Sequence, residues 1–279
     1  MLQIFFKKLL LFTVVVVLGG CNKDFQLVYQ PVYQNDFEFY KKVADNDTIL
    51  LISQGGPSPE LVSKEKVSNL LDFFPYNIAM VHQSQTKDPS VLDQFYISKE
   101  QANQLNDLSE EILNRTIDLF KEDGKHVVVF GVSFGSFLGL RAIAAAGVKA
   151  DLYALMNGRL DMEEEFWKLF KDKYYGYFEF REEKPQRIEK TKYISEKRLW
   201  ATTALMGNVG EPRYSRLLSE TKLSKLIYLH RFQDRVVGPM QPSEINFLQK
   251  QGAKVIGNDG DHGFNEKEYK FILDFIRSN

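Results

Sequence analysis

The sequence predicts an α/β fold, with helices on both faces of a central β-sheet that is mainly parallel. Short apolar runs, each typical of a buried strand, recur along the chain and alternate with segments of helical periodicity. This alternation indicates strand–helix–strand units, which build parallel sheets covered on both faces. The 279 residues are enough for one such domain with a sizeable core and an inserted segment.

The buried strands are predicted from apolar runs that end in glycine or polar residues. They are expected at residues 48–53, 77–82, 126–130, 151–156, 225–229 and 254–256. Ahead of them, apolar and polar residues alternate between about 22 and 47, which favours short antiparallel strands. Because ligand sites of parallel sheets lie beyond the carboxyl ends of the strands, the residues that follow each run are the candidates for chemistry.

Helices are predicted at residues 99–121, 134–146, 242–251 and 266–277. Their buried faces are predicted from apolar residues that recur at helical spacing. These residues are Leu105, Leu108, Ile112 and Leu119 in the first helix, and Tyr269, Ile272, Leu273 and Ile276 in the last.

One long stretch interrupts the alternation, since no apolar run typical of a buried strand occurs between 158 and 224. It is rich in aromatic and charged residues, around Trp167 and Tyr175 in particular. A long insertion at the active-site edge of a sheet is typical of a cap. We therefore expect a helical cap at about 159–224, and a helical excursion packed on the sheet is the alternative.

The N-terminus has the pattern of an export signal. Lys7 and Lys8 precede an apolar run at 9–18 that is short for a membrane span and ends in Leu18-Gly19-Gly20-Cys21. This ending resembles the bacterial lipobox. The resemblance implies that residues 1–20 are a signal peptide, that Cys21 carries the lipid, and that 21–47 is the lipidated N-terminus with the leading strands. An uncleaved helix that merely contains a cysteine is the alternative.

This prediction gives the protein a membrane partner, through the lipid on Cys21, and a place in the cell envelope outside the cytoplasm. The net charge of −1 supplies no field that would attract nucleic acid, so no nucleic-acid partner is expected. The single cysteine excludes an intramolecular disulfide. No metal-binding spacing and no phosphate-binding glycine loop occurs, so no metal or cofactor is expected.

The central motif is Gly131-Val132-Ser133-Phe134-Gly135, which follows an apolar run and opens a helical segment. This strand–turn–helix context is the one in which a nucleophile elbow presents its serine. The flanking glycines relieve crowding in the tight turn. Ser133 is therefore the candidate nucleophile, and a plain turn with a helix-capping serine is the alternative.

From about residue 48 to 275 the chain resembles the α/β-hydrolase family, whose nucleophile, acid and histidine follow one another in this order. By this resemblance Asp234, just beyond the fifth expected strand, is the triad acid. His262, just beyond the sixth and ahead of the last helix, is the triad histidine. His262 would take the proton of Ser133 and return it to the leaving group, while Asp234 would fix the imidazole tautomer.

Other residues compete for these roles. Asp161 follows the fourth expected strand, where some hydrolases of this family place their acid. Asp259 and Asp261 flank the histidine and are expected to stabilise its loop. Ser136 is expected only to pack, whereas His230 ends a strand just ahead of the acid loop and is a candidate lining residue.

An oxyanion hole would need two backbone N–H groups. One is expected from Phe134, the residue after the nucleophile. The other is expected from Gly55 or Gly56, in a Gln-Gly-Gly-Pro loop that resembles the His-Gly-Gly-Pro loop of proline iminopeptidase-like hydrolases. Gln54 departs from that pattern, which leaves the subfamily open. A simple turn before a helix is the alternative.

The sequence therefore predicts a serine hydrolase, anchored to a bacterial membrane by a lipidated cysteine, that acts through an acyl-serine intermediate. Small-molecule esters are the first expected substrates and short peptides the second. Two alternatives stay open: a proline iminopeptidase-like peptidase, suggested by Gly55-Gly56-Pro57, and a binding lipoprotein that keeps the fold without turnover.

Overall fold

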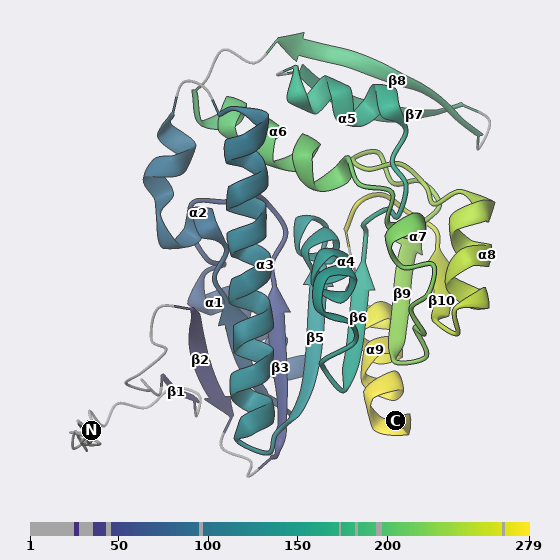
Figure 1. Cartoon of the computed structure of the whole chain (residues 1–279). Coiled ribbons are helices and arrows are strands. Elements are labelled where there is room, and N and C mark those ends of the chain that lie inside the picture. Colours follow the sequence, from purple (N-terminus) through teal and green to yellow (C-terminus); the bar gives the residue numbers. More distant parts are fainter. Residues whose placement is uncertain are drawn as a thin grey trace, which may run out of the picture.

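In the computed structural model, helices pack on both faces of one twisted sheet (Figure 1). The structure describes residues 25–27, 36–42, 46–94, 97–172, 174–181, 184–193, 197–263 and 266–279. The predicted signal peptide and Cys21 lie outside these residues. None of the helices within the described ranges is long and apolar enough to cross a membrane.

The central sheet has eight strands in the order β1-β2-β4-β3-β5-β6-β9-β10. Their bounds are Phe25–Leu27, Phe37–Lys42, Asn77–Val81, Thr48–Ser53, His126–Val132, Leu152–Met156, Leu226–Arg231 and Lys254–Asn258, in that order. The first two are antiparallel to their neighbours, and the pairs from β4 to β10 are parallel. The prediction of a mainly parallel sheet with leading antiparallel strands is confirmed.

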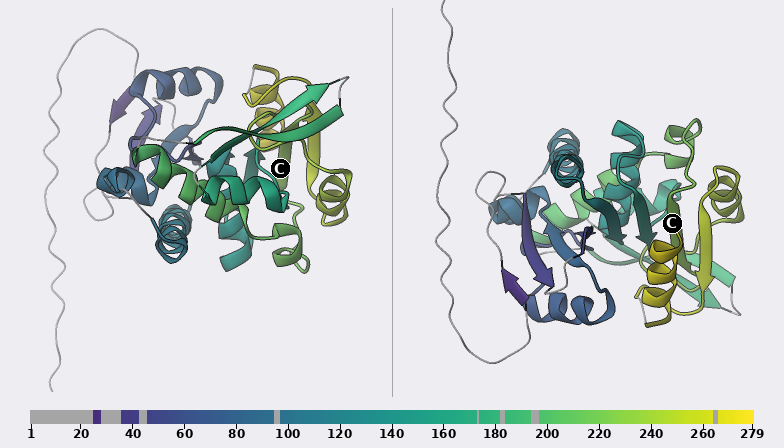
Figure 2. Two further views of the ribbon diagram at one scale, coloured as in Figure 1. Left: turned by 90° about the horizontal axis from the view of Figure 1, so that it is seen from above. Right: turned by 90° about the horizontal axis from the view of Figure 1, so that it is seen from below.

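Alternate residues of the parallel strands point to opposite faces, and both faces are apolar. In β3, Ile49 and Leu51 join the core that also contains residues of α3 (Lys99–Glu122) and α4 (Phe134–Ala146). Leu50 and Ile52 join the core under α1 (Lys64–Phe73) and α9 (Glu266–Ser278). The view from below in Figure 2 shows the sheet between these two helical layers. Two-sided burial explains why the strands are continuous apolar runs.

The buried face of α3 differs from the prediction. Leu108 was expected within the buried stripe but is 40% exposed. The face that packs on the sheet includes Ile112 and Ile117, together with the polar Ser109. The Ser109 hydroxyl accepts a hydrogen bond of 2.9 Å from the backbone N–H of Ser84. The spacing of apolar residues predicted the wrong buried face for α3 because the true buried face contains Ser109, a polar residue whose hydrogen-bond partner is also buried.

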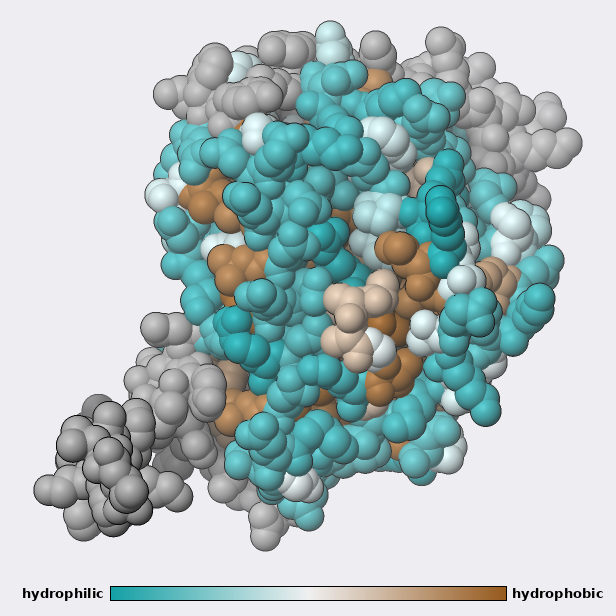
Figure 3. Space-filling view, viewed as in Figure 1, coloured by the Kyte–Doolittle hydropathy of each residue, from teal (hydrophilic) through white to brown (hydrophobic). Residues whose placement is uncertain are grey.

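Hydrophilic side chains cover most of the outer surface on this side of the molecule (Figure 3).

The inserted segment lies beyond the carboxyl ends of the parallel strands (Figure 1). It contains α5 (Glu164–Lys171), α6 (Lys197–Gly210) and α7 (Tyr214–Leu217). It also contains an antiparallel hairpin, β7 (Tyr174–Arg181) with β8 (Lys184–Tyr193), which forms a sheet of its own. The expectation of a helical cap missed this hairpin, because the sequence of its strands is aromatic and charged and contains no continuous apolar run.

Three further elements complete the described structure. They are α2 (Ser84–Lys87), the 3₁₀ helix η1 (Pro89–Asp93) and α8 (Pro242–Lys250). The first two follow β4 and lead into α3, whose start is fixed by a capping box between Ser98 and Gln101. The third separates the strands β9 and β10 and buries Leu248 in the same core as α3 and α4.

Candidate active site

Ser133 lies in a sharp turn between β5 and α4, with φ 52° and ψ −116°. Left-handed φ is strained for a residue other than glycine, and it places the serine at the carboxyl edge of the sheet. Both glycines of the motif are required by close packing. A β-carbon at Gly131 would collide with the carbonyl oxygen of Gly135, and one at Gly135 would collide with the backbone of Ser53. The motif therefore forms the elbow that its sequence predicts.

His262 lies between Ser133 and Asp234. Its Nε2 is 2.9 Å from the Ser133 Oγ, and its Nδ1 is 2.7 Å from the Asp234 Oδ2. With the proton on Nδ1, the imidazole donates to the carboxylate and can accept the serine proton at Nε2. A serine hydroxyl in this arrangement has a base in contact with it and a carboxylate that orients the base.

Asp234 is 1% exposed, and its carboxylate has two separate tasks. The Oδ1 atom accepts hydrogen bonds of 2.8 Å and 2.9 Å from the backbone N–H groups of Val236 and Val237. These bonds fix the turn after β9 and leave Oδ2 free to accept from His262. The carboxylate is therefore held in place before it orients the imidazole.

The competing acids bind elsewhere. Asp161 accepts from the backbone N–H of Ser215, at 3.3 Å, and from the Ser215 hydroxyl, so it fixes the start of α7. The Asp261 carboxylate accepts from the N–H of Arg235, at 2.9 Å, and from that of His262, at 2.7 Å. The backbone carbonyl oxygen of Asp259 accepts a hydrogen bond from Arg231. The geometry thus gives His262 a single carboxylate partner, Asp234, among the described residues.

The loop that carries His262 is held by two buried side chains that the sequence did not single out. Arg231, at the end of β9, donates to the carbonyl oxygens of Asp259, at 2.6 Å, and Gly263, at 3.2 Å. The guanidinium also pairs with Glu268 at 2.6 Å, and both side chains are almost fully buried. From the other side, the Asn157 amide donates to the same Gly263 oxygen at 2.7 Å.

A second buried ion pair supports the acid loop. Arg159 and Glu244 meet at 2.8 Å with side chains 0% and 1% exposed. Arg159 also donates to the carbonyl oxygen of Val237, at 3.2 Å. Burial by itself lowers the pKa of Arg159, but Glu244 and Glu163 outweigh it and hold that pKa above its usual value. The Arg159 guanidinium therefore stays charged, and its bonds tie the segment after β6 to the segment after Asp234.

Gly55 is the nearer of the two candidate oxyanion glycines. A β-carbon at Gly55 would stand 3.5 Å from the Ser133 β-carbon, in ordinary contact. Gly56 has φ +152° and a β-carbon there would collide with the backbone of Ser58. Phe134 opens α4, and the first N–H groups of a helix have no partner within it. Both residues therefore lie next to Ser133, Gly55 through space and Phe134 along the chain.

Gln54 has a structural task that explains its departure from the histidine of the related loop. Its amide donates to the Glu60 carbonyl oxygen, at 2.8 Å, and its Oε1 accepts from the Val62 N–H, at 2.7 Å. The side chain therefore braces the connection to α1, while its own carbonyl oxygen accepts from Gln83 at 2.8 Å.

Among the described residues, His230 forms no hydrogen bond with Ser133. It is 4% exposed, packs edge-on against Phe232 with ring centroids 5.2 Å apart, and its Nδ1 has no hydrogen-bond partner among the described residues. Burial, and then the charge of Arg159, lower the pKa of His230 to about 4. Across the described ranges, no three His, Cys, Asp or Glu side chains are grouped so as to hold a metal ion.

Several solved structures superpose on most of this chain and identify its fold. A thermostable carboxyl esterase from Bacillus coagulans superposes with a TM-score of 0.57 at 14% identity, over 92% of this chain and 99% of its own. An α/β-hydrolase enzyme from a Medee basin deep-sea metagenome library gives 0.57 at 11% identity, over 87% and 95%. The chain has the α/β-hydrolase fold.

A third structure with similar architecture is MenH from S. aureus, with a TM-score of 0.54 at 17% identity, over 87% of this chain and 98% of its own. No protein-family model matches the sequence. No curated protein matches it either. At these identities the likeness concerns the α/β-hydrolase fold, so the chemistry of this chain is argued from its own residues.

Proposed function

We propose that this α/β-hydrolase chain is a serine hydrolase that cleaves carboxylic esters through an acyl-Ser133 intermediate. The observation that carries the proposal is the continuous hydrogen-bond chain from Ser133 Oγ through His262 to the buried Asp234. A hydroxyl group becomes a competent nucleophile only when a base removes its proton as it attacks. In this series of hydrogen bonds, His262 is that base.

The proposed reaction has two halves. Ser133 Oγ attacks the ester carbonyl carbon while its proton passes to His262 Nε2, and the carbonyl oxygen becomes an oxyanion. The backbone N–H groups of Phe134 and Gly55 would stabilise that oxyanion. Collapse breaks the ester C–O bond, and the imidazolium protonates the departing alkoxide. Water, deprotonated by His262, then attacks the carbonyl carbon of the acyl-serine. The bond from this carbon to Ser133 Oγ breaks as the imidazolium returns its proton to Oγ, and the carboxylic acid is released.

We propose esters ahead of peptides because of the enzymes that share this fold. Structures with the same fold include a carboxyl esterase and metagenome-derived lipolytic enzymes. These names describe those proteins, and they make esters the first substrate class to test here.

The proposal is tested with a fluorophosphonate probe on the purified full-length chain, alongside Ser133→Ala, His262→Ala and Ser136→Ala. Ser136 is the matched control because it lies in the same helix start but is fully buried. We expect labelling of the wild type and of Ser136→Ala, and loss in the other two. A folded wild type that does not label, or a Ser133→Ala variant that does, contradicts the proposal. A panel of p-nitrophenyl esters and aminoacyl-naphthylamides then separates esterase from peptidase.

We also infer that the enzyme is held at a bacterial membrane by a lipid on Cys21. This inference rests on the lysine pair, the short apolar run and the Leu18-Gly19-Gly20-Cys21 ending. Labelling of cells with an alkyne palmitate is expected to mark the wild type but not Cys21→Ser. Membrane-bound, full-length Cys21→Ser protein would contradict it.

A further inference from the structure

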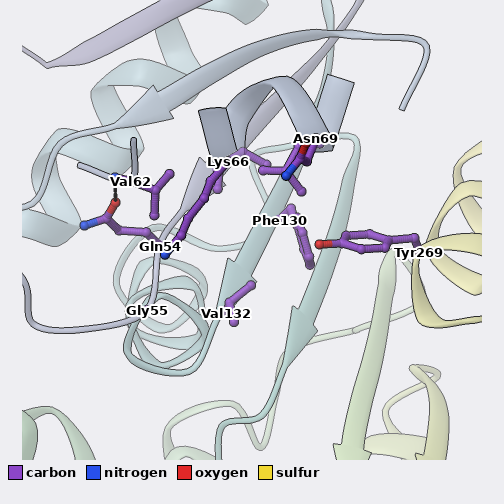
Figure 4. Close-up of a pocket in the computed structure, with 10 residues that line it drawn as sticks. Gln54, Gly55, Val62, Lys66, Asn69, Phe130, Val132 and Tyr269 are labelled. Carbon is purple, nitrogen blue, oxygen red and sulfur yellow. Dashed lines mark hydrogen bonds between the residues drawn. The ribbon is translucent and has the colours of Figure 1, made fainter. Parts of the chain in front are cut away.

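A pocket opens on the sheet face opposite α3 and α4, between α1 and α9 (Figure 4). Its volume is about 280 Å³, just below the roughly 300 Å³ of the smallest common ligand sites. Most of its wall is apolar. The residues that line it are Ile52, Gln54, Gly55, Val62, Lys66, Asn69, Leu70, Phe130, Val132 and Tyr269.

The pocket lies beside the triad but does not contain it. Val132 directly precedes Ser133 in the chain, and Gly55 lies against the Ser133 β-carbon. None of Ser133, Asp234 and His262 lines the pocket. Its occupant therefore need not react with the serine, and a site here would be additional to the proposed ester site.

One charged group faces this apolar space. Lys66 is exposed on α1, and in Figure 4 its side chain extends over the pocket toward Gln54 and Gly55. It forms no ion pair or hydrogen bond with any described residue. The far end of the pocket is formed by the rings of Phe130 and Tyr269, whose centroids are 6.5 Å apart. The lining thus combines a cation without an ion-pair partner among the described residues with an aromatic end, where the Tyr269 hydroxyl points toward Phe130 (Figure 4).

We propose that this pocket binds a medium-chain aliphatic carboxylate, with the carboxylate at Lys66 and the chain against Leu70, Phe130 and Tyr269. An anionic head satisfies the lysine, and an unbranched tail removes apolar surface from water. The pocket volume excludes a large ligand, and the absence of a second lining charge disfavours a zwitterion. The proposal goes beyond the ester hydrolysis proposed above and does not depend on it.

The test measures binding of a butyrate-to-decanoate series to the full-length Ser133→Ala variant by calorimetry. The ligands contain no ester bond, so their binding is independent of whether the proposed function holds. Affinity is expected to rise roughly fourfold with each methylene until the pocket is filled. Lys66→Glu should weaken octanoate binding roughly tenfold or more, while leaving 1-octanol unaffected. Lys64→Glu, on the same helix but outside the lining, is the matched control and should bind both ligands normally.

A second variant tests the apolar end. Leu70→Trp fills the pocket and should abolish binding of both octanoate and 1-octanol, with thermal unfolding used to establish that the variant is folded. The proposal is overturned by an affinity that does not depend on chain length. It is equally overturned by octanoate binding that survives Lys66→Glu, or by no binding at all.

Discussion

The side-chain amide of Asn157 donates a hydrogen bond of 2.7 Å to the carbonyl oxygen of Gly263, the residue that follows His262. Asn157 follows β6, whereas Gly263 belongs to the loop after β10, so the bond reaches across the end of β9. Arg231, at that end, donates to the same oxygen at 3.2 Å. Two strands thus position the loop on which the proposed base is carried.

Asn157→Gly removes this amide while keeping the backbone conformation, since Asn157 has φ 55° and glycine adopts such angles without strain. We expect the probe to label Ser133 roughly tenfold more slowly, as the loss of about one hydrogen bond at the base would produce. The free energy of unfolding should fall by only about 1 kcal/mol. Unchanged labelling with unchanged stability would show that Arg231 alone holds the loop.

The Arg231–Glu268 pair is predicted to be essential for stability. Replacing one partner leaves the other charge buried and unpaired, which costs about 3–5 kcal/mol in buried pairs. Glu268→Gln should therefore lower the urea midpoint strongly. Glu111→Gln is the control, because its pair with Arg115 is exposed and such pairs contribute about 0–1 kcal/mol. Similar urea midpoints for the two variants would contradict the prediction.

Replacing Asp234 is predicted to reduce turnover far more than replacing Asp161. Asp234→Asn should reduce kcat by up to about 10⁴-fold, because the amide favours the wrong imidazole tautomer, as in serine proteases. Asp161→Asn should leave kcat within a few fold, since Asp161 bonds to Ser215 and not to His262. Ester hydrolysis by both variants checks this prediction, and an inactive Asp161→Asn with an active Asp234→Asn would reverse the assignment.

Gly135→Ala should destabilise the fold by about 1–3 kcal/mol or more, because its β-carbon would collide with backbone atoms of Ser53 and Gln54 that cannot move independently. Gly139→Ala, in the same helix, meets only the side chain of Leu155, which can adjust. It is therefore expected to cost less. Thermal unfolding of the two variants should rank them in this order, and the opposite order would refute the packing argument.

Stability should depend on His230 at mildly acid pH. Burial lowers the pKa of His230 from 6.5 in the unfolded chain to about 4 in the folded one. Between these values the unfolded chain binds a proton that the folded chain does not, so stability falls as pH falls through this window. The loss is at most roughly 3 kcal/mol and is complete near pH 4.

The check is urea unfolding at about pH 7 and pH 5 for the wild type, His230→Leu and His126→Gln. The wild type and His126→Gln should lose stability on acidification, and His230→Leu should lose less. An equal loss in all three would assign the effect to other groups, among them His82, whose pKa is also lowered by burial.

The parallel sheet was predictable because its strands are buried on both faces and therefore stand out as apolar runs. The three triad candidates could be chosen because each lies just beyond such a run, where strand ends meet at one edge of a sheet, and because their order along the chain resembles that of the α/β-hydrolase family. The structure brings Ser133, His262 and Asp234 within hydrogen-bond distance, while their catalytic roles remain predictions.

The supporting residues could not be found in this way. Arg231 and Glu268 are separated by 37 positions, and Arg159 and Glu244 by 85, and nothing in the local sequence marks a charged residue as buried. Helix α1 was not predicted either, since Lys64–Phe73 buries only Val67, Leu70 and Leu71 and has a largely charged outer face. Periodicity detects apolar contacts, whereas paired charges depend on the whole tertiary fold.

The distance along the chain between Ser133 and His262 has a consequence for biosynthesis. These residues are 129 positions apart, and the second follows β10, the last strand to be synthesised and an edge of the sheet. A growing polypeptide thus carries its elbow serine long before any imidazole can reach it. Chains that stop short of β10 would lack His262 altogether, so under the proposed mechanism a nascent or truncated protein is inactive until this last described strand has docked.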